Sequence, residues 1–376
     1  MLHRLVVLAA VCGLVVRAAP ALEQQALEKK VVLVATPSRF DGDKQVYEIP
    51  RSDVYVNVKF GTQANSPNNT VILTLESTAP LDIASETNAA TSWVYGKSCT
   101  SNCPDANKEY DQSGTPGKSI TLAAFKGQWY ADSITIGPSA TVKTDFVALT
   151  QRFDAEPYDG GLLSLGINTL HQTVDKLLGI GKDPWITIYT GTSSDGQLVI
   201  GRNGHDKCNN AATWGITGDG WAVEKTSIEV DGTTKKDNQR LEFSITKPAT
   251  MIPSDSYDAV TKDANVASDG TVPDISKLKT IKITIGSNSW TLKPEDFTSK
   301  DNNGKQSLQL GKTTDNFPAI VLGNQFLKSR CLVLGGDASD KSKWQVGVGD
   351  PKSGAGVFGL SALLLSVVSV FHFLRL

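Results

Sequence analysis

The chain has 376 residues, and its 37 lysine and arginine side chains nearly balance 39 aspartate and glutamate side chains. A net charge of −2, with no long run of one sign, argues against a nucleic-acid partner. The sequence lacks the G-x-S-x-G, H-E-x-x-H and G-x-x-x-x-G-K-[ST] motifs, which argues against serine-hydrolase, zinc-protease and phosphate-loop chemistry.

The first residues predict a secretory signal peptide over residues 1–18. Arg4 precedes an apolar run from Leu5 to Val16, and small residues follow. The run is too short to span a bilayer, so a signal peptide is favoured over an N-terminal membrane anchor. We expect an N-terminal extension at residues 19–44, an N-terminal lobe at residues 45–190 and a C-terminal lobe at residues 191–349.

Four cysteines remain after removal of the signal peptide, an even number that suggests disulfides in an oxidising compartment. Cys99 and Cys103 are close enough in sequence to close a tight loop, which leaves Cys208 to pair with Cys331. A zinc site is the alternative, but the histidines are scattered and do not fall at ligand spacing. We therefore expect no metal and no other cofactor.

Most of the chain has the pattern of β-strands, with apolar residues at alternate positions and Gly, Asn, Asp or Ser between the runs. The clearest runs are residues 54–60, 71–76, 197–201, 227–232 and 281–292. Helical periodicity is mainly confined to residues 170–181 and 254–264.

Two polar segments between the runs carry separate predictions. Residues 233–240, TTKKDNQR, are expected to be a solvated turn. The sequon Asn68-Asn69-Thr70 lies in a polar stretch, which makes Asn68 a candidate for glycosylation.

An internal repeat divides the chain into two related halves. Residues 85–91, SETNAAT, recur as residues 244–250, SITKPAT. The apolar, glycine-broken residues 159–166, DGGLLSLG, have a looser counterpart at residues 319–327, AIVLGNQFL. Each pair is separated by roughly 160 residues, the size of one domain, so the pattern predicts a duplicated lobe.

Residues 350–376 carry a signal for attachment to a membrane. The stretch Val357 to Leu374 is almost wholly apolar, and small residues precede it. Small acceptor residues, a spacer and an apolar tail form the signal for a glycosylphosphatidylinositol (GPI) anchor. A C-terminal membrane helix is the alternative, but Arg375 alone could form its basic flank. We expect the lipid on Gly349, within the window Gly347 to Ser353, at the extracellular face of the plasma membrane.

The segments of the repeat resemble those of pepsin-like aspartic peptidases. Residues 80–94, PLDIASETNAATSWV, are similar to the family's apolar strand, its D-T-G-S-S motif and the Trp-Val that follows. The other similar segments, in the family's order, are SCTSNC (98–103), DGGLLSLG (159–166), QLVIGRNGHDKC (197–208), WAVEKTSIEVDG (221–232) and VLGNQFLKSRC (321–331). The resemblance implies an all-β, bilobal acid-protease fold with a central cleft and few short helices.

The same resemblance implies that the catalytic residues have been replaced. In this family two carboxylates, one from each lobe, face each other and share a proton. Glu86 falls where the first Asp belongs, and Asn88 replaces the following glycine. In the second lobe Ile245 falls at the Asp position and Lys247 at the glycine. A register set by the proline further on would instead place Ser244 there, which is not an acid either.

Residues 119–137 resemble the family's hairpin that closes over substrate, in a shorter form. Leu122 stands where the hairpin's tyrosine belongs, and Phe125 replaces a flexible glycine. Tyr130 is a poor substitute for that tyrosine, because it lies beyond the expected tip.

These replacements predict a non-catalytic pepsin-like protein that binds a peptide or protein between its lobes. An ion pair between Glu86 and Lys247 is one hypothesis for the former catalytic position. The alternative function is an active aspartic endopeptidase with a displaced carboxylate. Asp82 and Asp159 are the nearest candidates for it, although Asp159 is more simply a turn residue.

Overall fold

The computed structural model describes most of the two lobes. The described residues are 29–35, 54–62, 68–74, 92–101, 103, 110–121, 125–136, 140–153, 161–167, 173–181, 183–190, 196–201, 203–204, 208–209, 211–218, 220–247, 249–301, 303–313, 319–328 and 330–352. The predicted signal peptide and the apolar tail lie outside them.

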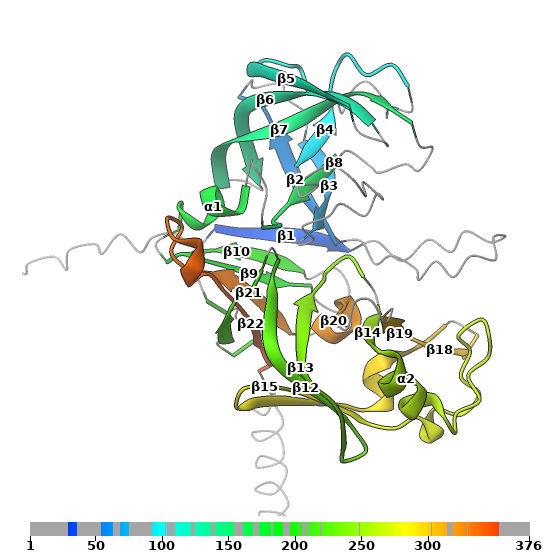
Figure 1. Cartoon of the computed structure of the whole chain (residues 1–376). Coiled ribbons are helices and arrows are strands. Elements are labelled where there is room, and N and C mark those ends of the chain that lie inside the picture. Colours follow the sequence, from blue (N-terminus) through cyan, green and yellow to red (C-terminus); the bar gives the residue numbers. More distant parts are fainter. Residues whose placement is uncertain are drawn as a thin grey trace, which may run out of the picture.

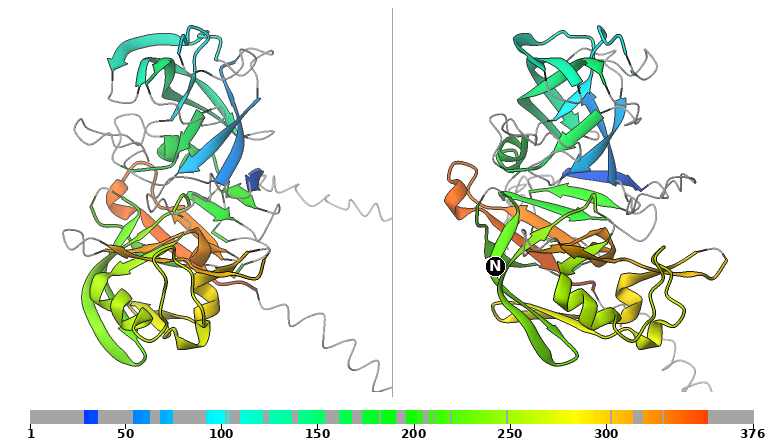
Figure 2. Two further views of the ribbon diagram at one scale, coloured as in Figure 1. Left: turned by 90° about the vertical axis from the view of Figure 1, so that its right-hand side faces the viewer. Right: turned by 45° about the vertical axis from the view of Figure 1, so that its right-hand side comes forward.

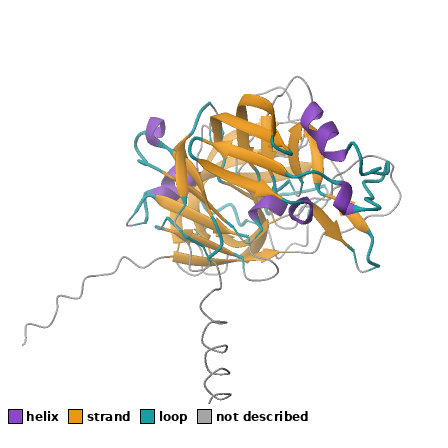
Figure 3. Ribbon diagram, turned by 90° about the horizontal axis from the view of Figure 1, so that it is seen from below, coloured by secondary structure: helices purple, strands orange, loops and turns teal. Residues whose placement is uncertain are grey.

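Strands form nearly all of the regular structure, and the few helices lie at the periphery (Figure 1, Figure 3). Among the described residues the α-helices are α1 (Thr173–Leu178), α2 (Ser254–Thr261) and α3 (Asn324–Leu327). The first two fall within the stretches whose periodicity predicts helix. No helix in the described part of the chain has the length and apolar character that a membrane span requires.

One large sheet runs from the N-terminal lobe into the middle of the molecule, as the three views in Figures 1 and 2 show. Its strands, in spatial order, are β11 (Ala212–Gly215), β22 (Gln345–Gly349), β21 (Cys331–Gly335), β9 (Trp185–Tyr189), β10 (Gln197–Ile200), β1 (Lys29–Ala35), β2 (Val54–Phe60), β3 (Asn68–Thr74), β8 (Gly161–Ser164), β4 (Trp93–Tyr95), β7 (Ala140–Arg152), β6 (Phe125–Ile136) and β5 (Thr115–Thr121). The sheet curls because β2 also pairs with β6.

A second sheet forms the C-terminal lobe, in the lower part of Figure 1. Its strands, in spatial order, are β16 (Asn288–Leu292), β15 (Ile281–Ile285), β12 (Ala222–Val230), β13 (Thr233–Phe243), β20 (Ala319–Leu322), β14 (Thr250–Pro253) and β19 (Leu310–Thr313). A separate pair consists of β17 (Thr298–Lys300) and β18 (Gln306–Leu308). Two curled sheets with few helices confirm the predicted all-β, bilobal fold.

The two lobes share one continuous apolar core. It contains side chains of the N-terminal lobe such as Phe146 and of the C-terminal lobe such as Ile283, all nearly or completely buried. Trp221 and Trp344 stack at its centre with ring centroids 5.6 Å apart. The indole nitrogen of Trp221 donates a hydrogen bond of 2.7 Å to the carbonyl of Leu165, which ties the second half of the chain to the first.

Strand β1 joins the two halves of the large sheet. Residues 29–32 pair with β10, and residues 33–35 pair with β2. This strand lies across the middle of the molecule in Figure 1 and belongs to the stretch expected to be an N-terminal extension. The pairing of β1 with β2 therefore crosses the expected boundary between the N-terminal extension (residues 19–44) and the N-terminal lobe (residues 45–190).

The expected turn at residues 233–240 is wrong, because these residues begin strand β13. They pair with β12 through a ladder interrupted by register shifts. Several of their side chains face solvent, so the polar composition reflects an exposed strand surface and not a loop. Residues 281–292 form two strands, β15 and β16, around a turn at Gly286. The sequon opens strand β3, since that strand begins at Asn68.

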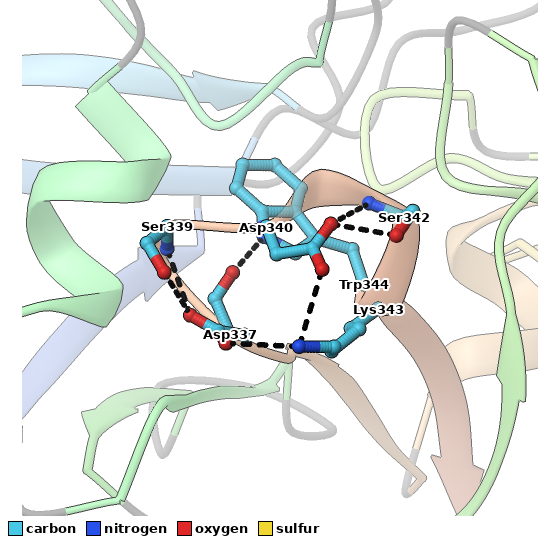
Figure 4. Close-up of polar contacts among 6 residues, drawn as sticks. All are labelled: Asp337, Ser339, Asp340, Ser342, Lys343 and Trp344. Atoms are coloured by element: carbon cyan, nitrogen blue, oxygen red, sulfur yellow. Dashed lines mark hydrogen bonds and ion pairs between the residues drawn. The ribbon is translucent and has the colours of Figure 1, made fainter.

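A charged turn connects β21 to β22 and is drawn in Figure 4. Asp337 Oδ1 accepts hydrogen bonds from the amide and hydroxyl of Ser339, and Asp340 Oδ1 accepts the same pair from Ser342. The Lys343 ammonium lies 3.5 Å from Asp337 Oδ2 and 3.1 Å from Asp340 Oδ2. The serine hydroxyls, with Lys343, hold the pKa of both carboxyls below their ordinary value.

Candidate functional site

The strands that flank residues 75–91 and residues 244–249 are arranged in the same way in the two lobes. Strand β20 lies between β13 and β14, parallel to the first and antiparallel to the second. Strand β8 lies in the same way between β3 and β4. The next neighbour is again parallel, β7 beside β4 and β19 beside β14. This shared arrangement agrees with the internal repeat, because residues 85–91 lie between β3 and β4 in the chain and residues 244–249 lie between β13 and β14.

The loop of the C-terminal lobe is held by its own hydrogen bonds. The Ser244 hydroxyl accepts from the amide of Lys247 at 3.1 Å and lies 3.3 Å from the Thr246 hydroxyl. The Lys247 carbonyl accepts from the amide of Asn324 at 2.7 Å. A Cβ on Gly323 would overlap the Ala249 carbonyl, so only glycine allows β20 to approach this loop so closely.

Residues 244–249 contain no carboxylate, and their apolar member belongs to the core. Ile245 is completely buried in the main cluster, and Ser244 is buried at 2% exposure. Lys247 is exposed. Whichever of Ser244 and Ile245 is aligned with the family's second Asp, this lobe presents no acid from the loop.

The loop of the N-terminal lobe is described only from Ser92 onward. Glu86, Asn88 and Asp82 lie outside the described residues, as does Asp159, so the ion pair of Glu86 with Lys247 stays a prediction.

Ser92 fixes the end of this loop. Its completely buried hydroxyl accepts from the amide of Ser164 at 3.1 Å and lies 3.1 Å from the Thr173 hydroxyl. It therefore joins β4 to β8 and to the start of α1.

The hairpin predicted from residues 119–137 is formed by β5 and β6. The pairing of Thr121 with Lys126 brackets its tip, and Leu122 lies outside the described residues. Phe125 is 5% exposed and packs in a cluster with Trp93, Tyr95 and Leu149. This residue is therefore packed against the N-terminal sheet.

Tyr130 lies in the main core and not in that cluster. Its ring meets Tyr110 edge-on, with centroids 5.3 Å apart. The Tyr110 hydroxyl donates to Asp132 Oδ2 at 2.8 Å and accepts from the amide of Gly114 at 2.6 Å. Burial, and then the bond to Asp132, raise the pKa of Tyr110 well above its ordinary value. These contacts fasten the base of the hairpin to residues 110–114.

Arg152 is a buried charge that the sequence does not reveal. It is 2% exposed and lies opposite Phe125 across the β6–β7 pair. Its guanidinium donates to the Tyr95 hydroxyl at 2.9 Å, and its amide donates to the Ser101 carbonyl. An arginine at the end of an amphipathic strand ordinarily faces solvent. The aromatic residues that contact or face Arg152, Tyr95 and Phe125, are distant in sequence, so no local pattern predicts its burial.

Both predicted disulfides are formed. Cys99 pairs with Cys103, and Cys208 pairs with Cys331, each with Cα atoms 6.1 Å apart. The first closes a short loop beside Arg152. The second joins Cys331 of β21 to Cys208, whose backbone forms a bridge with Pro351 just after β22. In the described part of the chain, no group of three or more His, Cys, Asp or Glu side chains could hold a metal ion.

The profile of the eukaryotic aspartyl protease family matches residues 78–342, more than half of the chain. The chain therefore belongs to this pepsin-like family, whose expected fold it shares. No curated protein sequence matches the chain.

Proposed function

We propose that this protein is a non-catalytic member of the aspartyl protease family that binds a peptide or protein between its lobes. The observation that carries the proposal is the loop at residues 244–249. It has no carboxylate, and Ile245 is completely buried in the core. One carboxylate from the other lobe cannot share a proton with an aliphatic side chain, so the paired acid–base step of the family is lost.

A peptidase assay at acid pH tests the loss of activity. We expect no cleavage of a mixed peptide library by the purified ectodomain, and no difference between the wild type and Glu86→Ala. The alternative is endopeptidase activity through a displaced carboxylate such as Asp82. Cleavage that disappears in Glu86→Ala or Asp82→Asn would establish that alternative and end the proposal.

Binding is proposed because two lobes that once held an extended substrate can keep a ligand without cleaving it. Exposed Lys247 gives the second loop a positive charge, which favours peptides with an acidic side chain.

A defined array of acidic, neutral and basic peptides tests this preference. Lys247→Glu should weaken binding of the acidic peptides and leave the neutral ones unchanged. Lys282→Glu, the same charge change at an exposed position of β15, is the matched control and should have no effect. Equal loss in both variants, or no acidic preference, would contradict the proposal.

We further propose a secreted protein held by a GPI anchor on the extracellular face of the plasma membrane and glycosylated at Asn68. The two disulfides support an oxidising compartment. Release of the protein from intact cells by a phosphatidylinositol-specific phospholipase is the expected result. A shift in gel mobility after glycosidase treatment, absent in Asn68→Gln, tests the glycan.

A further inference from the structure

The residues directly after β22 are held firmly by the folded domain. The Asp350 carbonyl accepts from the amide of Asn209 at 2.9 Å. Asp350 Oδ1 accepts from the indole nitrogen of Trp290 at 3.2 Å and lies 3.5 Å from the Arg330 guanidinium. Pro351 forms a bridge with Cys208. The folded domain therefore extends past Gly349 to Pro351.

Aromatic side chains and a disulfide support this clamp on the chain. Trp290 packs edge-on against Trp214 and Phe326, with centroids 5.6 Å and 5.8 Å away. The Arg330 guanidinium lies 4.6 Å from the Phe326 ring. Cys331, the disulfide partner of Cys208, pairs with Gly349 in the β21–β22 ladder.

These contacts bear on which residue would carry the lipid, a question that rests on the GPI anchor proposed above. Spacer length alone favours Gly349, because seven residues (350–356) separate it from the apolar stretch at Val357, whereas three (354–356) follow Ser353. An anchor signal has about 8–12 residues between the acceptor and its apolar tail. Attachment there would remove Asp350 and Pro351, and with them the contacts that these two residues make to Asn209, Trp290, Arg330 and Cys208. It would also put Asp350 and Pro351 at the two positions after the acceptor, where small residues are required.

Ser353, Gly354 and Ala355 form the first run of three small residues beyond the clamp. Lys352 separates them from Pro351, and the side chains of Asp350, Pro351 and Lys352 are all exposed. An acceptor at Ser353 keeps every contact of Asp350 and leaves the apolar stretch from Val357 to Leu374 on the removed peptide. We infer that the lipid is attached to Ser353, the last residue of the window expected from the sequence.

The reaction is an exchange of one amide for another. The carbonyl carbon of Ser353 loses its bond to the Gly354 nitrogen and gains a bond to the nitrogen of a primary amine on the glycolipid. The amine gives up one proton, and the Gly354 nitrogen takes one. The released peptide thus begins with a free amino group at Gly354, and no oxidant or reductant takes part.

Mass spectrometry of the mature C-terminus tests the assignment. The full chain is expressed in cells that make GPI anchors, and the lipid and glycan are removed chemically to leave the amine. Digestion before aspartate should give residues 350–353 with ethanolamine on Ser353. A peptide that ends elsewhere with ethanolamine overturns Ser353 while the anchor stands. An unmodified Leu376 at the C-terminus overturns both.

Paired variants provide a second measurement. Ser353→Leu combined with Gly354→Leu should lose most of the phospholipase-releasable protein at the surface. Lys352→Leu introduces the same side chain one residue earlier, lies outside the acceptor run, and should keep the wild-type signal. Unchanged release from the double variant would overturn the inference. Gly349 is unsuitable for this comparison, because a Cβ there would overlap the Asn209 carbonyl.

Discussion

The two lobes share one strand arrangement, but a buried serine beside or within the repeated segment has different hydrogen-bond partners in each lobe. In the N-terminal lobe the Ser92 hydroxyl bonds outward, to strand β8 and helix α1. In the C-terminal lobe the Ser244 hydroxyl bonds within the loop, and Ile245 inserts into the core. The duplicated fold thus preserves the strand order, while these two serine side chains differ in their partners.

The disulfides differ between the lobes in the same way. Cys99 and Cys103 close a loop with a sequence separation of 4, whereas Cys208 and Cys331 are separated by 123 residues. The first secures a local turn, and the second fastens the end of the C-terminal half. The comparison therefore predicts that removal of the two disulfides lowers the stability of the fold by unequal amounts.

The largest effect of a single substitution is expected for an acid at the second loop. Ile245→Asp places a carboxylate in the core, with no partner, at a position that is completely buried. It should lower the free energy of unfolding by more than about 4 kcal/mol, measured by urea denaturation, whereas Ile245→Val should cost only about 1 kcal/mol. A stability for Ile245→Asp close to that of the wild type would mean that this position faces solvent and could have held a catalytic acid.

Removal of each disulfide comes next. On the chain-entropy estimate, Cys208→Ser with Cys331→Ser should cost about 5 kcal/mol and Cys99→Ser with Cys103→Ser about 2 kcal/mol. Thermal unfolding of the two double variants under identical conditions measures the difference. Equal losses would show that the bridges act by local packing and not by loop length.

The two serines test the different fastening of the loops. Ser92→Ala leaves the buried amide of Ser164 without its acceptor, so a loss of about 2 kcal/mol is expected. Ser244→Ala affects the part-buried amide of Lys247, which water can reach, and should cost about 1 kcal/mol or less. Denaturant midpoints compare them, and a larger loss for Ser244→Ala would reverse our interpretation.

The smallest effect concerns the turn between β21 and β22. The folded-state pKa values of Asp337 and Asp340 lie below those of the unfolded chain, so the stabilisation is present above the ordinary aspartate pKa of about 3.9. It is lost as pH falls through the lower, folded values. The amide resonances of Ser339 and Ser342 should therefore titrate below about pH 3.9.

Lys343→Met serves as the control for that titration. Removing the ammonium should raise both midpoints toward the ordinary value, because Lys343 contributes to holding the two pKa values down. Midpoints that do not move would assign the whole effect to the hydroxyls and amides of Ser339 and Ser342.

Much of this architecture could be predicted from the sequence because alternation, turns and the repeat are local patterns. The helix at α2, the Cys99–Cys103 disulfide and the strand runs are local. The Cys208–Cys331 disulfide spans 123 residues and could be predicted only because the other two cysteines pair with each other. Residues 233–240 were harder, since a strand exposed to solvent and a polar turn have similar composition. Arg152 and the clamp on Asp350 depend on residues far apart in the chain, which no local pattern reports.

Strand β1 has a mechanical consequence for the molecule. Four of its residues pair with β10 and the remaining three with β2, so this one strand connects the two halves of the large sheet. A hinge motion that separates these halves must shear hydrogen bonds at the junction of Val32 and Leu33. Removal of the N-terminal residues up to and including Ala35 would delete strand β1. The two lobes should then move more easily relative to each other.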